Sequence, residues 1–104
     1  MTLKQLTTKL KKFNKERGWD DGLVPEDVAK SIIIEAAELL EHYQWDASER
    51  NNNKNKQKDT EAIGEEIADV LIYTLRIAYL MNLDIEKIVL DKIQKNAVRY
   101  LPKN

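Results

Sequence analysis

The chain has 104 residues, of which 42% are hydrophobic, and this is enough apolar material for the core of one small domain over residues 1–104. Its 17 basic and 18 acidic residues leave a formal net charge of −1, which excludes a general electrostatic attraction to nucleic acid or to an anionic membrane. Because the chain contains no cysteine, disulfide bonds and thiolate metal ligands are also excluded.

Two segments bear on export and membranes. The chain begins Met1-Thr2-Leu3-Lys4 and continues as an amphipathic, lysine-rich stretch, unlike the uninterrupted apolar core of a signal peptide. The longest apolar stretch, Ile67–Met81, is too short and too interrupted by charge to span a bilayer. We therefore expect a mature, unexported N-terminus, a cytoplasmic location and no membrane partner.

The first expected helix begins after Thr2 and ends at Gly18. Its apolar positions recur at helical spacing, at Leu3, Leu6, Leu10 and Phe13. Thr2 and Gln5 can form a capping box, and Gly18 is placed to stop the helix. A turn over residues 19–22 follows.

The second expected helix runs from Pro25, at a first helical position, to about Trp45. One broad stripe of this helix is apolar and consists of Val28, Ile32, Ile33, Ala36, Leu39, Leu40 and Tyr43. A second strip lies beside it and consists of Ser31, Glu35, Glu38, His42 and Trp45. The acidic residues of this helix thus border its apolar face.

Residues 46–59 are nearly all polar, and this composition predicts a mobile loop. A third helix is expected over about residues 60–81, and its second half is apolar almost all the way round. Such a helix must be covered on nearly every side, which three other short helices can hardly do. We therefore expect an oligomer, either a homodimer or a homotetramer.

The fourth expected helix begins after Asp84, its expected N-cap, and Pro102 closes it. Its inward stripe is expected to consist of Ile85, Ile88, Val89, Ile93 and Ala97. No β pattern, glycine-rich phosphate loop or internal repeat competes with this interpretation. The predicted fold class is all-α, a four-helix bundle that completes its core by oligomerisation.

Two short acidic pairs carry the chemical signal of the sequence. Glu35 and Glu38 lie three residues apart, as do Glu66 and Asp69, so each pair presents two carboxylates on one face of its helix. Within Ile67–Met81 only Asp69 and Arg76 are charged, and a carboxylate in such apolar surroundings needs a partner. A hard divalent cation such as Mg²⁺, which takes oxygen ligands, is the natural candidate.

A single acidic pair on a helix is most often solvated, but two matched pairs beside facing apolar stripes converge on one cleft between antiparallel helices. Three other carboxylates of these helices point elsewhere and are expected to be solvated: Glu41, Glu61 and Glu65.

Cationic and aromatic residues extend the candidate site. Lys92, Asn96 and Arg99 align along the fourth helix, either as a phosphate-binding stripe or as a surface stripe that complements the helix C-terminus. Tyr73 and Trp45 lie one and two turns beyond the acidic pairs, where they either stack on a nucleobase or pack in the core. His42, one turn after Glu38, is a hydrogen-bonding candidate without an assigned role.

The order and spacing of these motifs resemble the MazG-like, all-α nucleoside triphosphate pyrophosphohydrolases, and within them the dCTP pyrophosphatase branch. The resemblance covers nearly the whole chain. The matching motifs are Phe13-x-x-Glu16-Arg17-x-Trp19, Pro25 ten residues before the Glu35-x-x-Glu38 pair, Gln44-Trp45, Glu65-Glu66-Ile67-Ala68-Asp69-Val70-Leu71-Ile72-Tyr73 and Lys92-x-x-x-Asn96-x-x-Arg99-Tyr100.

The resemblance implies that Mg²⁺, with Mn²⁺ as a substitute, is held by Glu35, Glu38, Glu66 and Asp69. It implies hydrolysis of a nucleoside triphosphate between the α and β phosphates, with Glu35 or Glu38 as the catalytic carboxylate. It further implies phosphate contacts by Lys92, Asn96 and Arg99, and a nucleobase bordered by Trp45, Tyr73 and Trp19. Metal is then obligatory, because clustered carboxylates alone repel a triphosphate.

The chain departs from the dCTP pyrophosphatase pattern before the first acidic pair. The branch usually carries a histidine two residues before the proline and a basic residue after it, whereas this chain has Leu23 and Glu26. These departures argue for a nucleotide choice different from, or broader than, cytosine. Ala37 replaces a glycine often found before the second glutamate, which a helix tolerates.

Two other functions stay open on the sequence. A non-catalytic nucleotide-binding or regulatory module would keep the fold without turnover. A DNA-binding helical protein would use the basic first helix, although lysines interleaved with an apolar stripe usually form a solvated face. The basic residues concerned are Lys4, Lys9, Lys11, Lys12, Lys15 and Arg17.

Overall fold

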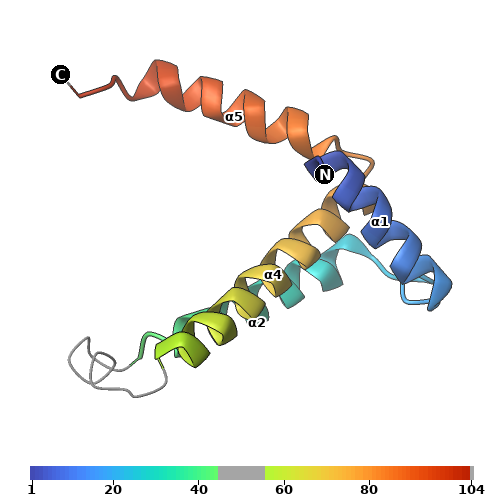
Figure 1. Ribbon diagram of the computed structural model, residues 1–104. Coiled ribbons are helices and arrows are strands. Elements are labelled where there is room, and N and C mark those ends of the chain that lie inside the picture. Colours follow the sequence, from blue (N-terminus) through green and yellow to red (C-terminus); the bar gives the residue numbers. More distant parts are fainter. Residues whose placement is uncertain (45–55, 104) are drawn as a thin grey trace. The chain divides into compact units, whose positions relative to one another are not determined.

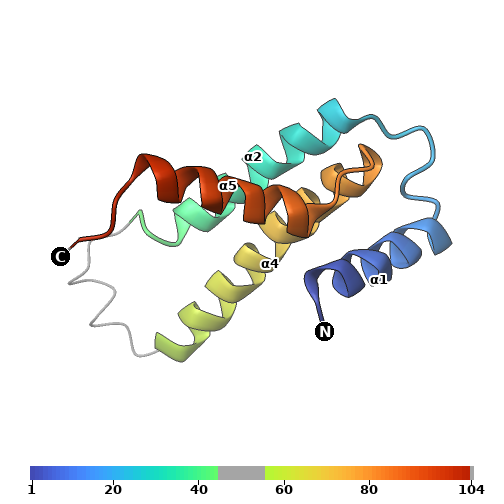
Figure 2. The same ribbon diagram turned by 90° about the horizontal axis from the view of Figure 1, so that it is seen from above.

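The computed structural model describes residues 1–44 and 56–103 and is shown in two views (Figures 1 and 2). The helices are α1 (Leu3–Glu16), α2 (Pro25–Glu41), α4 (Lys56–Leu80) and α5 (Ile85–Arg99). The described residues contain no strand, so the predicted all-α class is confirmed. Trp45 and the expected loop up to residue 55 lie outside the described residues. No described helix has the length and apolar character needed to cross a membrane.

The predicted caps of α1 are both present. Thr2 and Gln5 form the capping box, in which the Gln5 N–H donates to Thr2 Oγ1 at 3.1 Å and the Thr2 N–H donates to Gln5 Oε1 at 2.7 Å. At the other end Gly18 has φ +67°, and the Trp19 N–H bonds back to the Asn14 carbonyl at 3.1 Å. These bonds form a Schellman motif, which a left-handed glycine favours.

Two helix boundaries differ from the sequence expectation. The expected end of the second helix near Trp45 is wrong, because α2 ends at Glu41 and the chain tightens into turns, with the Tyr43 N–H bonded to the Leu40 carbonyl at 2.9 Å. The expected start near Thr60 is also wrong, because α4 begins at Lys56. Lysine and glutamine are good helix formers, so residues 56–59 extend the helix despite their polarity.

The chain divides into two compact units, one made of Met1–Gly22 with Leu75–Asn104 and the other of Leu23–Thr74. In the first unit Leu75, Ala78 and Ile85 form a buried cluster, and Leu3 and Leu10 of α1 pack against it. The Lys4 N–H also donates to Glu86 Oε1 at 2.9 Å. The start of α1 is thus held against the start of α5.

A second Schellman motif ends α4. The Leu83 N–H donates to the Ala78 carbonyl at 2.9 Å, and Asn82, at φ +56°, takes the left-handed position that a glycine takes at the end of α1. Asp84 then caps α5, its carboxylate accepting from the Lys87 N–H at 3.1 Å. This confirms the predicted N-cap of the last helix.

The apolar stripes expected to face inward are largely exposed in the single chain. Val28 of α2 is 1% exposed, but Ile33 is 71% exposed. On α5, Ile85 is buried whereas Ile93 is 58% exposed. The expectation that oligomerisation completes the core stays a prediction, because an amphipathic pattern identifies a face that avoids water without identifying what covers it.

Candidate functional site

Three carboxylates meet in the unit formed by Leu23–Thr74. There α2 and the first part of α4 run antiparallel beside each other (Figure 1), and oxygens of Glu35, Glu38 and Glu66 all lie within 4.8 Å of one another. The i, i+3 spacing places Glu35 and Glu38 on one face of α2, and Glu66 approaches from α4. We refer to Glu35, Glu38 and Glu66 as the acidic cluster.

Burial separates these carboxylates from their neighbours along the same helices. All three members of the acidic cluster are half-buried. By contrast Glu41, Glu61 and Glu65 are exposed, as the sequence predicts. A carboxylate is rarely withdrawn from water without a partner. The partial burial of the acidic cluster therefore needs an explanation, whereas the exposed acids need none.

Two oxygen atoms of the acidic cluster have no hydrogen-bond partner. Glu35 Oε2 and Glu66 Oε2 are both buried, and within the described residues neither accepts a hydrogen bond. Leaving buried carboxylate oxygens unpaired is costly, and most such atoms in folded proteins are satisfied. Oxygens of three carboxylates converge here, so the acidic cluster could hold a cation.

The carboxyl groups of Glu35 and Glu66 hold their protons more tightly than usual. Burial is the largest cause that raises the pKa of Glu35 above its ordinary value of 4.5, followed by the interaction with Glu38 and the charges of Asp69 and Glu66. Burial likewise raises the pKa of Glu66, followed by the charge and contact of Glu38 and the charge of Asp69. A cation that binds here therefore competes with protons.

His42 and Asp69 border the acidic cluster. His42 Nε2 lies 3.8 Å from Glu66 Oε1, and a positive charge on this ring opposes the rise in the pKa of Glu66. Asp69 is half-buried one turn beyond Glu66, but it is not among the three residues whose oxygens converge. The structure thus brings together three of the four predicted metal ligands, with Asp69 near enough to act on two of them through its charge.

The acidic cluster fits a hard divalent cation. Its donors are all carboxylate oxygens, which Mg²⁺ prefers, and two of these oxygens are buried and unpaired. The set contains neither a sulfur ligand nor a histidine nitrogen within the converging group, so it is less suited to Zn²⁺.

The remaining predicted substrate residues lie in several places. Tyr73 is half-buried on α4, one turn after Asp69, and belongs to the same unit as the acidic cluster. Lys92, Asn96 and Arg99 are exposed on α5 in the other unit. Trp19 also belongs to that unit and is 56% exposed. Trp45 lies outside the described residues.

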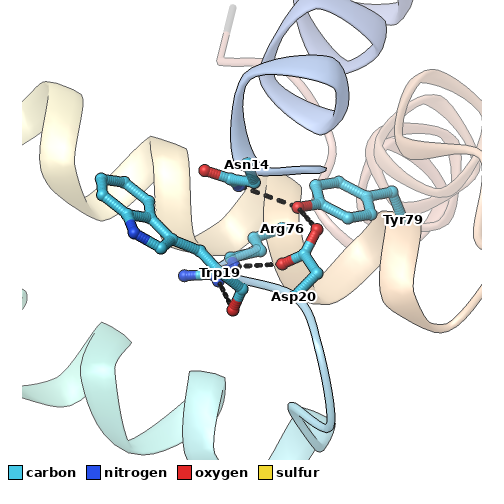
Figure 3. Close-up of polar contacts among 5 residues, drawn as sticks. All are labelled: Asn14, Trp19, Asp20, Arg76 and Tyr79. Atoms are coloured by element: carbon cyan, nitrogen blue, oxygen red, sulfur yellow. Dashed lines mark hydrogen bonds and ion pairs between the residues drawn. The ribbon is translucent and has the colours of Figure 1, made fainter. Parts of the chain in front are cut away.

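A polar network that the sequence patterns did not predict lies in the unit that contains α1 and α5 (Figure 3). Arg76 Nε donates to Asp20 Oδ1 at 2.8 Å, and the Tyr79 hydroxyl donates to Asp20 Oδ2 at 2.6 Å. Asn14 Nδ2 in turn donates to the Tyr79 hydroxyl oxygen at 2.8 Å. We call these four residues the Arg76 network; its one visible signal in the sequence is that Arg76 is the single basic residue within Ile67–Met81.

Comparison with known proteins identifies the family. The profile of the MazG-like family matches residues 30–103, which include both acidic pairs and the Lys92, Asn96 and Arg99 stripe. The chain belongs to the MazG-like family. The resemblance recognised from the order of the sequence motifs is thereby confirmed. Trp19, Asp20 and Asn14 lie before the part of this MazG-like chain that the profile matches.

Relatives of this MazG-like chain include two mammalian proteins named dCTP pyrophosphatase 1. The protein from Rattus norvegicus is 30% identical over 100 residues, and the one from Homo sapiens is 29% identical over the same length. Each match covers 95% of this chain but only 59% of the relative. The chain thus spans about three fifths of the length of these relatives.

A solved structure matches over nearly its whole length. It is a pyrophosphatase from Archaeoglobus fulgidus, which is 35% identical in sequence and superposes with a TM-score of 0.80. The match covers 96% of the MazG-like chain described here and 93% of the archaeal one. The helical architecture is therefore that of a known pyrophosphatase.

Proposed function

We propose that this MazG-like protein hydrolyses (deoxy)nucleoside triphosphates between the α and β phosphates and releases a nucleoside monophosphate and pyrophosphate. The observation that carries the proposal is the acidic cluster, in which Glu35, Glu38 and Glu66 converge and two oxygens lack partners. The relatives named dCTP pyrophosphatase and pyrophosphatase support the same reaction class. The proposed role is the removal of surplus or non-standard nucleotides.

The cofactor in this proposal is Mg²⁺, with Mn²⁺ as a substitute, held by Glu35, Glu38, Glu66 and Asp69. When bound, the ion offsets the negative charge of the triphosphate and makes a bound water more acidic. Glu38 or Glu35 orients the attacking water and accepts its proton. The water oxygen forms a new bond to the α phosphorus, the bond from this phosphorus to the bridging oxygen breaks, and pyrophosphate leaves with that oxygen and the bonding electron pair.

The substrate contacts are proposed from the family resemblance of the sequence motifs. Lys92, Asn96 and Arg99 contact the phosphates, since two cations and an amide spaced along one helix face suit phosphate oxygens. Tyr73, Trp45 and Trp19 border the base. The chain carries Leu23 and Glu26 where the dCTP pyrophosphatase pattern has a histidine and a basic residue, which favours a substrate range that differs from dCTP alone.

The decisive experiment is pyrophosphate release from a panel of standard and modified triphosphates, with and without Mg²⁺. We expect activity that requires Mg²⁺ and large losses in Glu38→Gln and Asp69→Asn, with the helical circular dichroism retained. The matched control is Glu41→Gln, because Glu41 is an exposed carboxylate three residues further along the chain. Parental rates in both site variants, or nucleotide binding without any release, would overturn the proposal.

We also propose that the protein forms a homodimer or homotetramer. The support is the exposed apolar surface of the single chain, where α2 carries Ile33 and Leu40 at 71% and 68% exposure and α5 carries Val98 at 84%. Light scattering at micromolar concentration should give the mass of two or four chains. A clean monomer would contradict the proposal.

A further inference from the structure

Trp19 is held through both of its main-chain polar groups. Its N–H donates to the Asn14 carbonyl at 3.1 Å, and its carbonyl oxygen accepts from Arg76 Nη2 at 2.7 Å. The indole meets the Phe13 ring edge-on, with ring centroids 5.7 Å apart and planes at 71°. In Figure 3 the indole points away from the Tyr79 side of the network. Trp19 is thus 56% exposed as a residue, although both of its main-chain polar groups are bonded.

Arg76 is itself rigidly placed. Its Nε atom bonds to Asp20, whose other oxygen is taken by the Tyr79 hydroxyl, and that hydroxyl is bonded to Asn14. The side chains of Arg76 and Asp20 are 12% and 19% exposed, and Asn14 is 3% exposed. Burial raises the pKa of the Tyr79 hydroxyl, so it remains a neutral donor to Asp20. These contacts hold the guanidinium in the orientation that the structure shows.

We propose that Arg76 is a positioning residue for nucleotide recognition, because its second donor fixes the Trp19 carbonyl and so presents the exposed indole in one orientation to a planar base. This inference rests on the proposed function, in which Trp19 borders the base. An aromatic ring that is ordered before the base arrives loses less conformational entropy on stacking. The fork geometry of arginine is required, since lysine has a single nitrogen and cannot serve Asp20 and the Trp19 carbonyl in the same way.

A purely structural role for Arg76 makes a different prediction. If Arg76 only stabilised the fold, any break in its network would have the same effect on substrate binding. Tyr79→Phe offers this comparison, because it removes the hydroxyl that links Asp20 and Asn14 and leaves the bond from Arg76 to Trp19 in place. The positioning role and the purely structural role therefore predict different effects of the two variants on the Michaelis constant.

The test is a steady-state kinetic comparison of the parent, Arg76→Lys, Tyr79→Phe, Trp19→Ala and the double variant Trp19→Ala/Arg76→Lys, with the best substrate of the panel. Because base–aromatic stacking is worth about 1–3 kcal/mol, we expect Arg76→Lys to raise KM about tenfold with kcat within about twofold of the parent. Tyr79→Phe should change KM by less than about twofold. In the Trp19→Ala background Arg76→Lys should raise KM no further, since it acts through the missing ring.

A second readout does not depend on turnover. In a Trp45→Phe background Trp19 is the remaining tryptophan, and its fluorescence anisotropy should fall in Arg76→Lys but not in Tyr79→Phe. An active parent with unchanged KM in Arg76→Lys, or equal KM shifts with and without Trp19, overturns this inference and leaves the proposed function intact. A parent that neither releases pyrophosphate nor binds any triphosphate of the panel overturns both.

Discussion

The acidic cluster and the Arg76 network are two groups of polar side chains, one in each compact unit, and they differ in how completely the chain satisfies them. In the Arg76 network the guanidinium, the carboxylate, the phenol and the amide bond to one another. In the acidic cluster like charges face each other and two buried oxygens accept no hydrogen bond. The comparison indicates that the polar groups of the Arg76 network satisfy one another, whereas the acidic cluster leaves two buried oxygens that a cation could satisfy.

Raised pKa values occur in both groups but have different meanings. In the Arg76 network burial raises the pKa of Tyr79, and the neutral hydroxyl still finds a donor and an acceptor. In the acidic cluster the pKa values of Glu35 and Glu66 rise through burial and through the negative charges around them. The first shift accompanies a satisfied contact, whereas the second records repulsion that a cation would relieve.

The largest expected effect is on activity. Glu66→Gln should lower pyrophosphate release by on the order of a hundredfold or more, because a neutral amide cannot replace a converging carboxylate at a metal. The matched control is Glu65→Gln, whose side chain is exposed on the same helix and should keep the parental rate. Equal rates in the two variants would remove the distinction between the acidic cluster and the surface acids.

The next effect is on stability. Asp20→Ala removes the acceptor of Arg76 Nε and of the Tyr79 hydroxyl, and we expect a loss of about 2–4 kcal/mol in the free energy of unfolding. Asp91→Ala breaks the exposed pair with Lys87 instead and should cost less than about 1 kcal/mol. Urea unfolding of both variants measures the difference. Similar losses would show that the Arg76 network contributes no more than a surface ion pair.

The smallest effect is the pH dependence of the metal-free protein. Below pH 4.5 Glu35 and Glu66 are protonated in both the folded and unfolded states, so they do not lower the free energy of unfolding there. As pH rises above 4.5 the unfolded chain releases these protons first, so the folded state loses stability until its own raised pKa values are passed. The melting temperature in a chelator should therefore fall with pH in this window.

Glu35→Gln should flatten that fall, and Mg²⁺ should reverse it, because the ion favours the deprotonated carboxylates. Thermal unfolding followed by circular dichroism measures both effects. Parallel pH curves for parent and variant would mean that repulsion within the acidic cluster does not affect the fold.

Local sequence signals predicted much of this molecule. Helix ends were predicted to within a residue or two, because capping depends on near neighbours. The signals were the capping residues Thr2, Gly18 and Asp84 and the first helical proline. The three-residue spacing within each acidic pair likewise placed Glu35 and Glu38 on one face of α2, and helical periodicity separated them from the exposed Glu41.

Features that depend on distant partners could not be predicted in this way. The bond between Arg76 and Asp20 joins residues 56 apart in the chain, and no periodicity connects a turn residue with a helix residue. The end of α2 at Glu41 was missed because residues 42–44 contain neither proline nor glycine and tighten through short-range bonds. The exposure of Ile93 was missed because periodicity does not show which surface covers an apolar stripe.

Asn14 makes two contacts at once. Its main-chain carbonyl accepts from the Trp19 N–H, and its side-chain amide donates to the Tyr79 hydroxyl. Replacing it therefore disturbs a helix terminus and a tertiary contact in a single mutational step. Descendants of this gene should accordingly inherit Asn14, Asp20, Arg76 and Tyr79 as a block, and lineages that lose one should have replaced the others. Ancestral reconstruction would reveal whether the four substitutions cluster on the same branches.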